Sequence, residues 1–305
     1  MDAARHRGRR LDLHKGFLLI NPRSGGERTS SEEIEGKARE LGVETRLLEE
    51  GEDAAVLARQ AVERGAETLG VGGGDGSLAA VAAVALEHDV PFVCIPLGTR
   101  NHFARDLHLD LNDPVAALTA FRGRERRVDV GRVGERVFLN NVSLGLYASL
   151  VHDPERKTRN RFMAFVRMAP AALGRSRTPL DVSFELEGKR EHRAALVVLV
   201  ANNEYRIETM ADLGERERHD GGLLHAFVIE AVSRRTLVGL LLKAAVGDAD
   251  EAEGLVEYTA RELRVDLPDH RIHAAIDGEP VVLEAPLEFE LEPQALRVLV
   301  PASAV

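Results

Sequence analysis

Cysteine is almost absent from this sequence, because Cys94 is the only one in 305 residues. A single cysteine cannot form a disulfide within the chain, which fits a reducing compartment. Residues 1–10 are basic but lack the apolar segment that a secretory signal requires. We therefore expect a cytoplasmic protein in which residues 1–14 form a disordered tail.

Long hydrophobic runs are also missing. The most apolar late stretch, residues 236–246, has about half the length of a membrane-spanning helix and contains Lys243. We expect no transmembrane segment. The expectation is a soluble protein that can still act as a peripheral protein on the inner membrane face.

Positive charge is in deficit, since 40 Lys and Arg residues stand against 50 Asp and Glu residues and the net charge is −10. This balance argues against a general nucleic-acid binder. The sequence contains no His-Glu-x-x-His, and His270 and His273 are oddly spaced, which argues against a transition-metal site. Ser77 and Ser143 have no organised His and Asp partners, which argues against a hydrolase.

The first part of the sequence alternates short apolar runs with helical patterns. The strand-like runs are residues 17–20, 43–48, 68–71 and 91–95, and the helical runs between them are residues 34–41, 53–64 and 78–87. This alternation predicts a parallel sheet with helices on both faces, a three-layer α/β domain. A further helix is expected over residues 113–121, with Asp113 as its N-cap and Pro114 at its first position.

The pattern changes after Gly123. Strand-like runs with turn residues between them occupy residues 126–131, 136–143, 180–186, 194–201, 223–229, 256–267, 271–276 and 287–290. They predict a mostly antiparallel β-sandwich domain, interrupted by helical segments at 160–173 and 236–246. We divide the chain into a tail (1–14), an N-terminal nucleotide-binding α/β domain (15–130), a C-terminal β-rich acceptor domain (131–290) and a final strand (291–305) that can return to the N-terminal domain.

A glycine-rich turn, Gly72-Gly73-Gly74-Asp75-Gly76-Ser77, connects an apolar strand to a helical run. Glycine lets the backbone approach a ligand closely, and the N–H groups at a helix start favour an anion. The alternative is a tight turn that merely needs glycine. The turn matches neither a Walker A loop nor G-x-G-x-x-G.

Two similar turns follow other strands of the same predicted sheet. They are Asn21-Pro22-Arg23-Ser24-Gly25-Gly26 and the stretch from Pro96 to Arg105, which contains Thr99 and Asn101. Ligands of parallel sheets bind beyond the carboxyl ends of the strands, where all three turns are expected. Taken alone, the first could be an ordinary Asn-Pro turn. Together the three turns predict a nucleotide phosphate site.

With these turns assembled, the sequence resembles the diacylglycerol kinase catalytic-domain family, which includes bacterial lipid kinases and sphingosine kinases. This family shares its N-terminal fold with NAD kinases and phosphofructokinases. The matching stretches, in the family's order, are Asn21-Pro-Arg-Ser-Gly25, Gly73-Gly-Asp-Gly-Ser77, Pro96-Leu-Gly-Thr-Arg-Asn-His-Phe-Ala-Arg105, Asn140-Asn-Val-Ser-Leu-Gly145, Asp220-Gly221 and Asp277-Gly-Glu279.

The resemblance implies an ATP site and a general base. The residues implied at the ATP site are Asn21, Ser24, Gly25, Gly73, Gly74, Asp75, Gly76, Ser77, Thr99 and Asn101. Asp75 would manage the charge of the reacting phosphates together with Mg²⁺. Glu279 matches the glutamate that takes the proton from the acceptor hydroxyl, although Asp-Gly-Glu by itself is also a common hairpin turn.

The resemblance also implies a structural Mg²⁺ held by Asp220 and, by spacing, the carbonyl groups of Glu217 and Gly222. Relatives often place a threonine near the position of Leu48 and Glu49, against the nucleotide. This sequence has none there.

The implied function is an ATP-dependent lipid kinase that transfers the γ-phosphate of ATP to a hydroxyl of diacylglycerol or a related lipid. Two alternatives stay open: a kinase of a soluble acceptor such as NAD, and a nucleotide-binding regulator without catalysis. The expected partner is a lipid at a membrane surface, and a homodimer is compatible with the sequence. Residues 157–168 combine basic and aromatic side chains that either face anionic headgroups or pack a helix into the β domain.

Overall fold

Parallel strands form the sheet of the N-terminal half, as the alternating pattern predicts. In the computed structural model, which describes residues 15–24, 30–98, 101–145, 179–186, 188–203, 221–233, 235–239 and 253–304, four strands follow the order β4–β3–β1–β2. They are β1 (Gly16–Ile20), β2 (Glu44–Leu47), β3 (Thr68–Gly73) and β4 (Phe92–Pro96). All neighbouring pairs among them are parallel.

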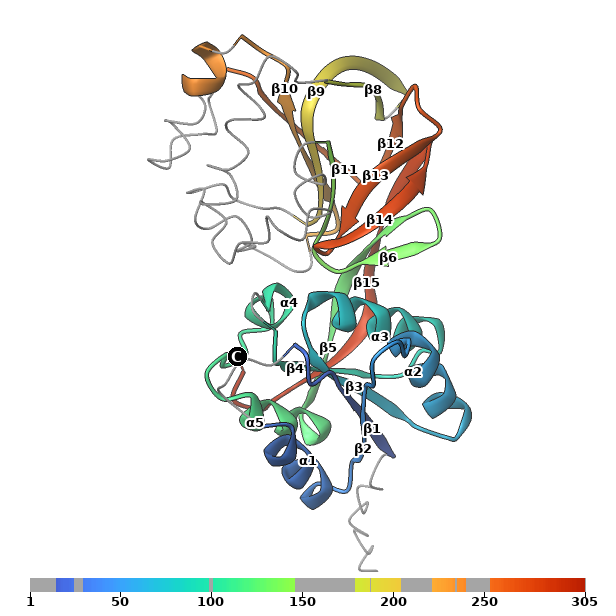
Figure 1. Ribbon diagram of the computed structural model, residues 1–305, viewed down its shortest axis with the longest axis vertical. Coiled ribbons are helices and arrows are strands. Elements are labelled where there is room, and N and C mark those ends of the chain that lie inside the picture. The colour runs from blue at the N-terminus through green and yellow to red at the C-terminus, as the bar shows by residue number, and fades with distance from the viewer. Residues whose placement is uncertain are drawn as a thin grey trace, which may run out of the picture.

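Helices cover both faces of this sheet and complete the three layers (Figure 1). The helices are α1 (Ser31–Glu40), α2 (Ala54–Glu63), α3 (Asp75–Glu87), α4 (His102–Asp106) and α5 (Pro114–Ala117), which continues into the 3₁₀ helix η1 (Leu118–Arg122). One apolar core joins α2 and α3 to the sheet, and a second core joins α1, α5 and η1 to its other face. The central strands are therefore buried on both sides, which explains their continuous apolar sequences.

Short polar side chains begin three of these helices. Ser30 accepts a hydrogen bond from the N–H of Glu33, and Asp53 accepts from two N–H groups at the start of α2. Asp113 caps α5 with Pro114 in its first turn, as predicted. The predicted helix over residues 113–121 is correct in place but is α-helical for only its first turn and 3₁₀ after that.

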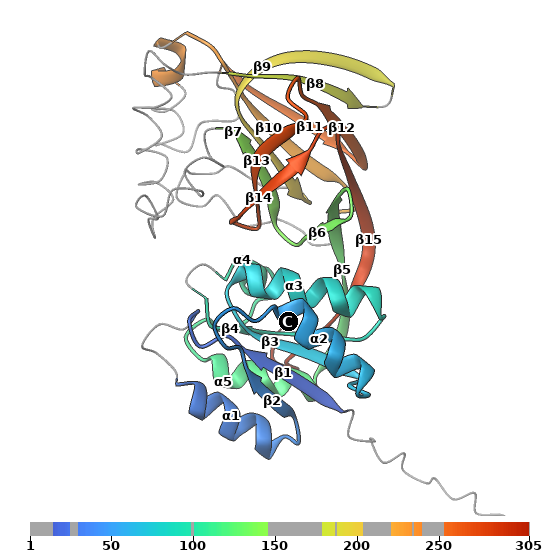
Figure 2. The same ribbon diagram turned by 45° about the vertical axis from the view of Figure 1, so that its right-hand side comes forward.

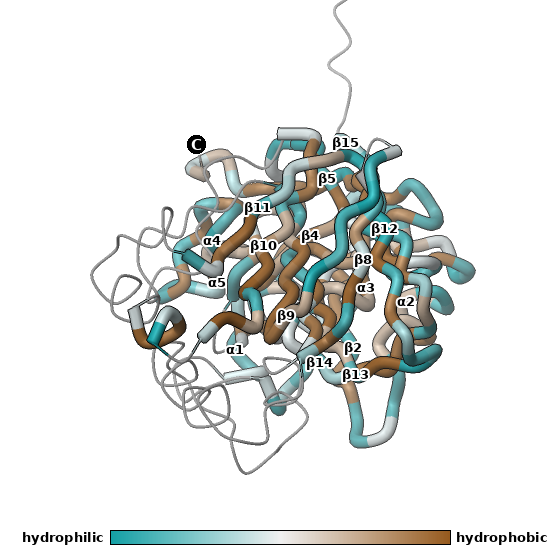
Figure 3. Tube along the Cα trace, turned by 90° about the horizontal axis from the view of Figure 1, so that it is seen from above, coloured by the Kyte–Doolittle hydropathy of each residue, from teal (hydrophilic) through white to brown (hydrophobic). Residues whose placement is uncertain are grey.

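Antiparallel strands form the C-terminal half. They are β7 (Asn141–Gly145), β8 (Leu180–Leu186), β9 (Lys189–Asn202), β10 (Leu224–Glu230), β11 (Leu255–Ala260), β12 (Glu262–Asp266), β13 (Arg271–Ile276) and β14 (Glu279–Glu284). A single buried cluster fills the space between them, which confirms the predicted sandwich class. Figure 3 shows the hydrophobic colour concentrated along strands such as β4 and β10.

One predicted strand is divided in the structure. Residues 256–267 are predicted as a single strand-like run, but the chain bends at Arg261 and forms β11 and β12. β11 pairs with β10, whereas β12 pairs with β8 and β15. β11 and β12 therefore pair with different strands of the sandwich. Strand propensity alone does not show where one strand ends and the next begins.

Two long strands connect the halves: β5 (Arg124–Val133), which forms a hairpin with β6 (Arg136–Phe138), and β15 (Leu287–Val300). β15 is antiparallel to β5 along most of its length, pairs with β12 near its start and pairs in parallel with β4 near its end. Figures 1 and 2 show both strands running from one half to the other. Every described strand consequently belongs to one hydrogen-bonded sheet.

A bulge in β15 explains why the sequence predicts two separate strands there, one over residues 287–290 and a final one within residues 291–305. The register with β5 shifts between Glu292 and Leu296, and Gln294 has a φ of 51°. The buried carboxylate of Asp129 in β5 accepts the N–H of Gln294 at 2.7 Å and the N–H of Gly222 at 2.9 Å. Asp129 therefore holds the bulge of the connecting strands together with the loop that precedes β10.

Among the described residues, no helix is long and apolar enough to cross a membrane. The predicted helical segment at 160–173 and the basic, aromatic residues at 157–168 lie outside the described ranges.

Candidate active site

The glycine-rich turn leads from β3 directly into α3. Gly74 is the N-cap of α3 and provides no side-chain cap for the N–H groups of the first helical turn. These N–H groups are donors that an anion can satisfy, and the helix dipole adds to the attraction. Asp75 is the first helical residue and the acidic side chain of this turn. The turn thus combines backbone donors for phosphate with a carboxylate suited to a divalent cation.

The turn after β1 lies against this helix start. The N–H of Asn21 donates to the carbonyl of Gly72 at 2.8 Å, and its side-chain amide donates to Ser77 Oγ at 3.0 Å. A Cβ at position 74 would lie 3.8 Å from Ser24 Oγ. The predicted ATP-site residues of these two turns are therefore brought together by the sheet.

The turn after β4 is the third turn at this edge of the sheet, and it contacts the glycine-rich turn. Asn101 has a φ of 51°, and its side-chain amide donates to the carbonyl of Gly98 at 2.8 Å. A Cβ at Gly98 would lie only 2.6 Å from Cα of Gly74, so glycine is required for the two turns to approach. The N–H of His102 donates to Asp75 Oδ1 at 3.1 Å. This bond fixes one oxygen of Asp75 relative to the start of α4.

The turn after β4 also contains a buried hydrogen-bond acceptor. Asn101 is 5% exposed, and its Oδ1 accepts no hydrogen bond from the described part of the chain. A buried carbonyl oxygen without a donor is costly, and a ligand hydroxyl, amino group or metal-bound water would satisfy it. With the uncapped helix start, the residues present fit a nucleotide and its cation.

Glu279 reaches this site from the other half of the molecule. It begins β14, directly after the turn formed by Asp277 and Gly278. An added Cβ at Gly76 would lie 2.5 Å from Cγ and 2.8 Å from Oε1 of Glu279. The carboxylate therefore rests on the first turn of α3, one residue from Asp75, and glycine at position 76 makes room for it.

Asp277 anchors the turn that carries Glu279. The residue is 8% exposed, and its carboxylate accepts three backbone N–H groups, from Leu139 at 2.8 Å, Asn140 at 2.7 Å and Asn141 at 3.0 Å. Burial raises the pKa of Asp277 to about 6, the three hydrogen bonds oppose this rise, and the charge of Asp75 adds to it. The turn is thus fixed to the segment that precedes β7.

This pKa predicts a dependence of stability on pH. Because the pKa of Asp277 is about 6 when folded and 3.8 ordinarily, the folded protein binds the proton more tightly. The stabilisation is fully present below about pH 4 and is lost as the pH rises through about 6. Between about pH 4.5 and pH 7, the wild type should lose about 2 kcal/mol more unfolding free energy than Asp277→Asn, measured by urea denaturation. Equal losses in both proteins would contradict this assignment.

Several predicted site residues lie outside the described ranges: Gly25, Thr99, Glu217 and Asp220. Gly222, the remaining predicted metal ligand, has a φ of +69° and donates its N–H to Asp129 and to Asn203 Oδ1. Within the described ranges, no three His, Cys, Asp or Glu side chains form a group that could hold a metal. The structural Mg²⁺ site therefore stays a prediction.

Sequence reasoning missed the parts played by Asp277 and Asp129. Asp277 belongs to a motif noted for its glutamate, and two of its three backbone donors, Asn140 and Asn141, belong to another quoted motif. Nothing local indicates that the two motifs meet. Asp129 stands as a lone acid in the apolar run Val128-Asp129-Val130. A charged residue inside a buried strand is itself a signal of a specific partner, because an unpaired buried charge is costly.

Comparison with known proteins agrees with this arrangement. The diacylglycerol kinase catalytic domain matches residues 15–133, and the YegS C-terminal NAD kinase beta sandwich-like domain matches residues 141–300. The chain belongs to the diacylglycerol kinase catalytic-domain family. Membership in this family makes it a phosphotransferase of the kind that uses an alcohol group as acceptor.

Relatives of the family match the chain over nearly its whole length. A protein of Mycobacterium tuberculosis named diacylglycerol kinase is 28% identical, over 96% of this chain and 97% of the relative. A protein of Pseudomonas fluorescens that carries the name lipid kinase YegS-like is 30% identical, over 95% and 97%. The resemblance inferred from short motifs is thereby confirmed.

Solved structures show the same fold. A crystal structure of a diacylglycerol kinase from Bacillus anthracis overlays with a TM-score of 0.69, at 18% identity over 96% of this chain and 98% of that one. Another chain from the same organism reaches a TM-score of 0.75 at 20% identity, over 96% and 98%.

Proposed function

We propose that this diacylglycerol kinase family member is an ATP-dependent lipid kinase that transfers the γ-phosphate of ATP to a hydroxyl of diacylglycerol or a related lipid. The observation that carries the proposal is the contact between Glu279 of β14 and Gly76 of α3. It brings a carboxylate suited to an acceptor hydroxyl next to a turn suited to phosphate. Phosphoryl transfer requires both, held in a fixed relation.

The donor side of the site uses backbone groups. The N–H groups at the start of α3 would bind phosphate oxygens, with Asn21 and Ser24 beside them and Asn101 Oδ1 available to a ligand donor. Such donors are pre-oriented by the sheet and need little rearrangement when charge shifts on the phosphates.

Asp75 is the residue that would hold Mg²⁺ with the phosphates, and its position is set by the hydrogen bond from His102. Bound Mg²⁺ neutralises phosphate charge in this class of reaction. A carboxylate oxygen is a ligand that this cation prefers. The second, structural Mg²⁺ that we propose near Asp220 would lie in the loop whose end, at Gly222, is held by Asp129.

The acceptor side uses Glu279 as general base. Its carboxylate would accept the proton of the lipid hydroxyl as the oxygen attacks the γ-phosphorus, while ADP leaves from the opposite side. Asp277 acts through Glu279: three backbone hydrogen bonds keep the turn, and therefore the base, at a constant place above α3. Asp277 is in this sense a positioning residue.

The proposal of a lipid acceptor is supported by the family and by the names of the relatives. The test is incubation of the full chain with radiolabelled ATP and Mg²⁺, offering diacylglycerol in detergent micelles, a sphingoid base, and NAD in separate reactions. We expect label in the diacylglycerol product, removed when Mg²⁺ is chelated. Label in NAD alone would replace the lipid acceptor by a soluble one, and no label in any acceptor would contradict kinase activity.

A further inference from the structure

The strand order β4–β3–β1–β2 sets the direction in which a nucleotide can extend from the phosphate site. Asp75 and Glu279 lie at the start of α3, after β3, and the proposed function places the reacting γ-phosphate beside them. On the β4 side the two turns touch, since an added Cβ at Gly98 would lie 2.6 Å from Cα of Gly74. The rest of ATP therefore extends the other way, past the turn after β1 and toward the end of β2.

The end of β2 lies beside the turn after β1. The N–H of Leu48 donates to the carbonyl of Ile20 at 2.8 Å, and the side chain of Leu48 is buried in the core that joins α2 to the sheet. Glu49 follows Leu48 in the same way that Asn21 follows Ile20. Because neighbouring strands lie about 4.8 Å apart, the backbone of Glu49 is about one strand spacing from the turn that carries Asn21.

The side chain of Asn21 already has partners within the protein. Its amide group donates to Ser77 Oγ at 3.0 Å, and its Oδ1 accepts the N–H of Arg23 at 3.1 Å. The hydroxyl groups of a bound ribose are donors that need acceptors at this end of the site. Since Asn21 is engaged in holding the two turns together, the neighbouring strand β2 is the next place that can supply an acceptor.

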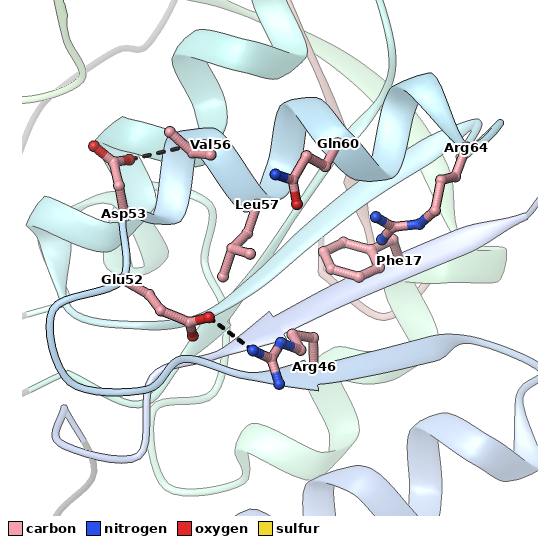
Figure 4. Close-up of a pocket in the computed structure, with 8 residues that line it drawn as sticks. All are labelled: Phe17, Arg46, Glu52, Asp53, Val56, Leu57, Gln60 and Arg64. Atoms are coloured by element: carbon pink, nitrogen blue, oxygen red, sulfur yellow. Dashed lines mark hydrogen bonds and ion pairs between the residues drawn. The ribbon is translucent and has the colours of Figure 1, made fainter.

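Two of the acidic side chains that follow β2 also have local partners. The carboxylate of Glu52 accepts a hydrogen bond from Arg46 at 2.7 Å and another from the N–H of Glu49 at 2.8 Å. Asp53 accepts two N–H groups at the start of α2. Figure 4 shows Glu52 directed toward Arg46 and Asp53 directed toward Val56. These two acids therefore serve the turn and the helix cap.

Glu49 differs from these two acids. Its side chain is 69% exposed, and its Oε1 lies 3.3 Å from Nη1 of Arg46. The hydrogen bond from its N–H to Glu52 fixes its backbone. A carboxylate has about four lone-pair sites, so that of Glu49 can accept further hydrogen bonds on its solvent side while Arg46 holds it in place.

We propose that Glu49 binds the ribose of ATP, with its carboxylate accepting hydrogen bonds from the 2′- and 3′-hydroxyl groups. The inference rests on the proposed function, because the direction of ATP follows from the place proposed for the γ-phosphate. In dinucleotide-binding sheets, an acidic residue that follows the phosphate turn in the chain binds the ribose 2′-hydroxyl by the same chemistry. Glu49 thus selects a sugar with free hydroxyl groups and disfavours one that carries phosphate there.

The test is calorimetric titration of the full chain with ATP and with 2′,3′-dideoxy-ATP, both in the presence of Mg²⁺. The wild type should bind ATP about tenfold more tightly than the dideoxy nucleotide, a difference typical of a hydrogen bond to a charged group. Glu49→Ala should weaken ATP binding about tenfold and leave binding of the dideoxy nucleotide unchanged, so that the two dissociation constants become equal. A purely structural role would weaken both nucleotides alike and keep their ratio.

Glu40→Ala is the matched control, because Glu40 is also an exposed glutamate that pairs with a basic side chain three residues away, Lys37. It should leave both dissociation constants unchanged. Equal binding of the two nucleotides by the wild type would overturn the assignment of Glu49 alone, as would a ratio that Glu49→Ala leaves at the wild-type value. Failure to bind either nucleotide would overturn the donor side of the proposed function as well. Lipid phosphorylation is not part of this readout, so the identity of the acceptor does not affect it.

Discussion

Glu279→Gln should lower kcat by about 10³-fold, the range that general base catalysis contributes in enzymes. Glutamine keeps the size of the side chain beside Gly76 but cannot take a proton from the acceptor hydroxyl. Because Glu279 is not placed among the phosphate-binding groups, ATP affinity should change little. Initial rates of lipid phosphorylation and titration of ATP by calorimetry separate the two effects.

A matched control lies at the other end of the same strand. Glu284 is the last residue of β14 and is exposed. Glu284→Gln should retain wild-type turnover. If Glu279→Gln turned over as fast as Glu284→Gln, the general base would have to be another residue, although the fold assignment would stand.

Asp75→Asn should lower kcat by a factor of about 10² to 10³, because it removes the negative charge that we place on the cation beside the phosphates. Asparagine still offers an oxygen to the N–H of His102, so the start of α4 should keep its place. The thermal unfolding midpoint should therefore stay close to that of the wild type. Rates measured over a range of Mg²⁺ concentrations should also show a raised requirement for the ion.

The control for Asp75 is an acid just beyond the opposite end of α3. Asp89 has a φ of 49°, which asparagine adopts readily, and its side chain is 77% exposed. Asp89→Asn should leave both turnover and the Mg²⁺ dependence unchanged. Full activity of Asp75→Asn would refute the role of this carboxylate, and with it the assignment of the turn as the centre of the phosphate site.

The two site predictions differ in what each side chain must do. Asp75 contributes a fixed charge, so its loss should affect the interaction with the phosphates and the cation. Glu279 contributes a proton acceptor, so its loss should affect the removal of the proton from the acceptor hydroxyl. Kinetics with varied ATP and varied lipid should therefore show the Asp75 variant responding to the donor side and the Glu279 variant to the acceptor side.

The local structure of the phosphate turn could be predicted from the sequence. Apolar residues predict a buried strand up to Val71, glycines indicate an open turn, and the run after Asp75 is typical of a helix. The structure has these elements as β3 and α3, with Gly74 between them. The prediction succeeds because strand, turn and helix depend on neighbouring residues.

Longer-range features could be predicted only in part. The acidic cap Asp113 was identified because its partner, the N–H of Ala116, is three residues away. The bond from Gln294 to Asp129 was not, because its two ends belong to different parts of the sequence. In the same way, the runs that form β15 were visible, but their union across a bulge depends on pairing with β5.

Most helices and strands, the three polar turns at one sheet edge and the motifs that indicate the family could be predicted from the order of the amino acids. The contact of Glu279 with Gly76, and the hydrogen bonds by which Asp277 holds the turn before Glu279, appear only in the folded chain. The physical reason is the range of the interactions. Propensity, capping and turn chemistry act between near neighbours, whereas the site is made by contacts between distant segments that exist only once both halves have packed.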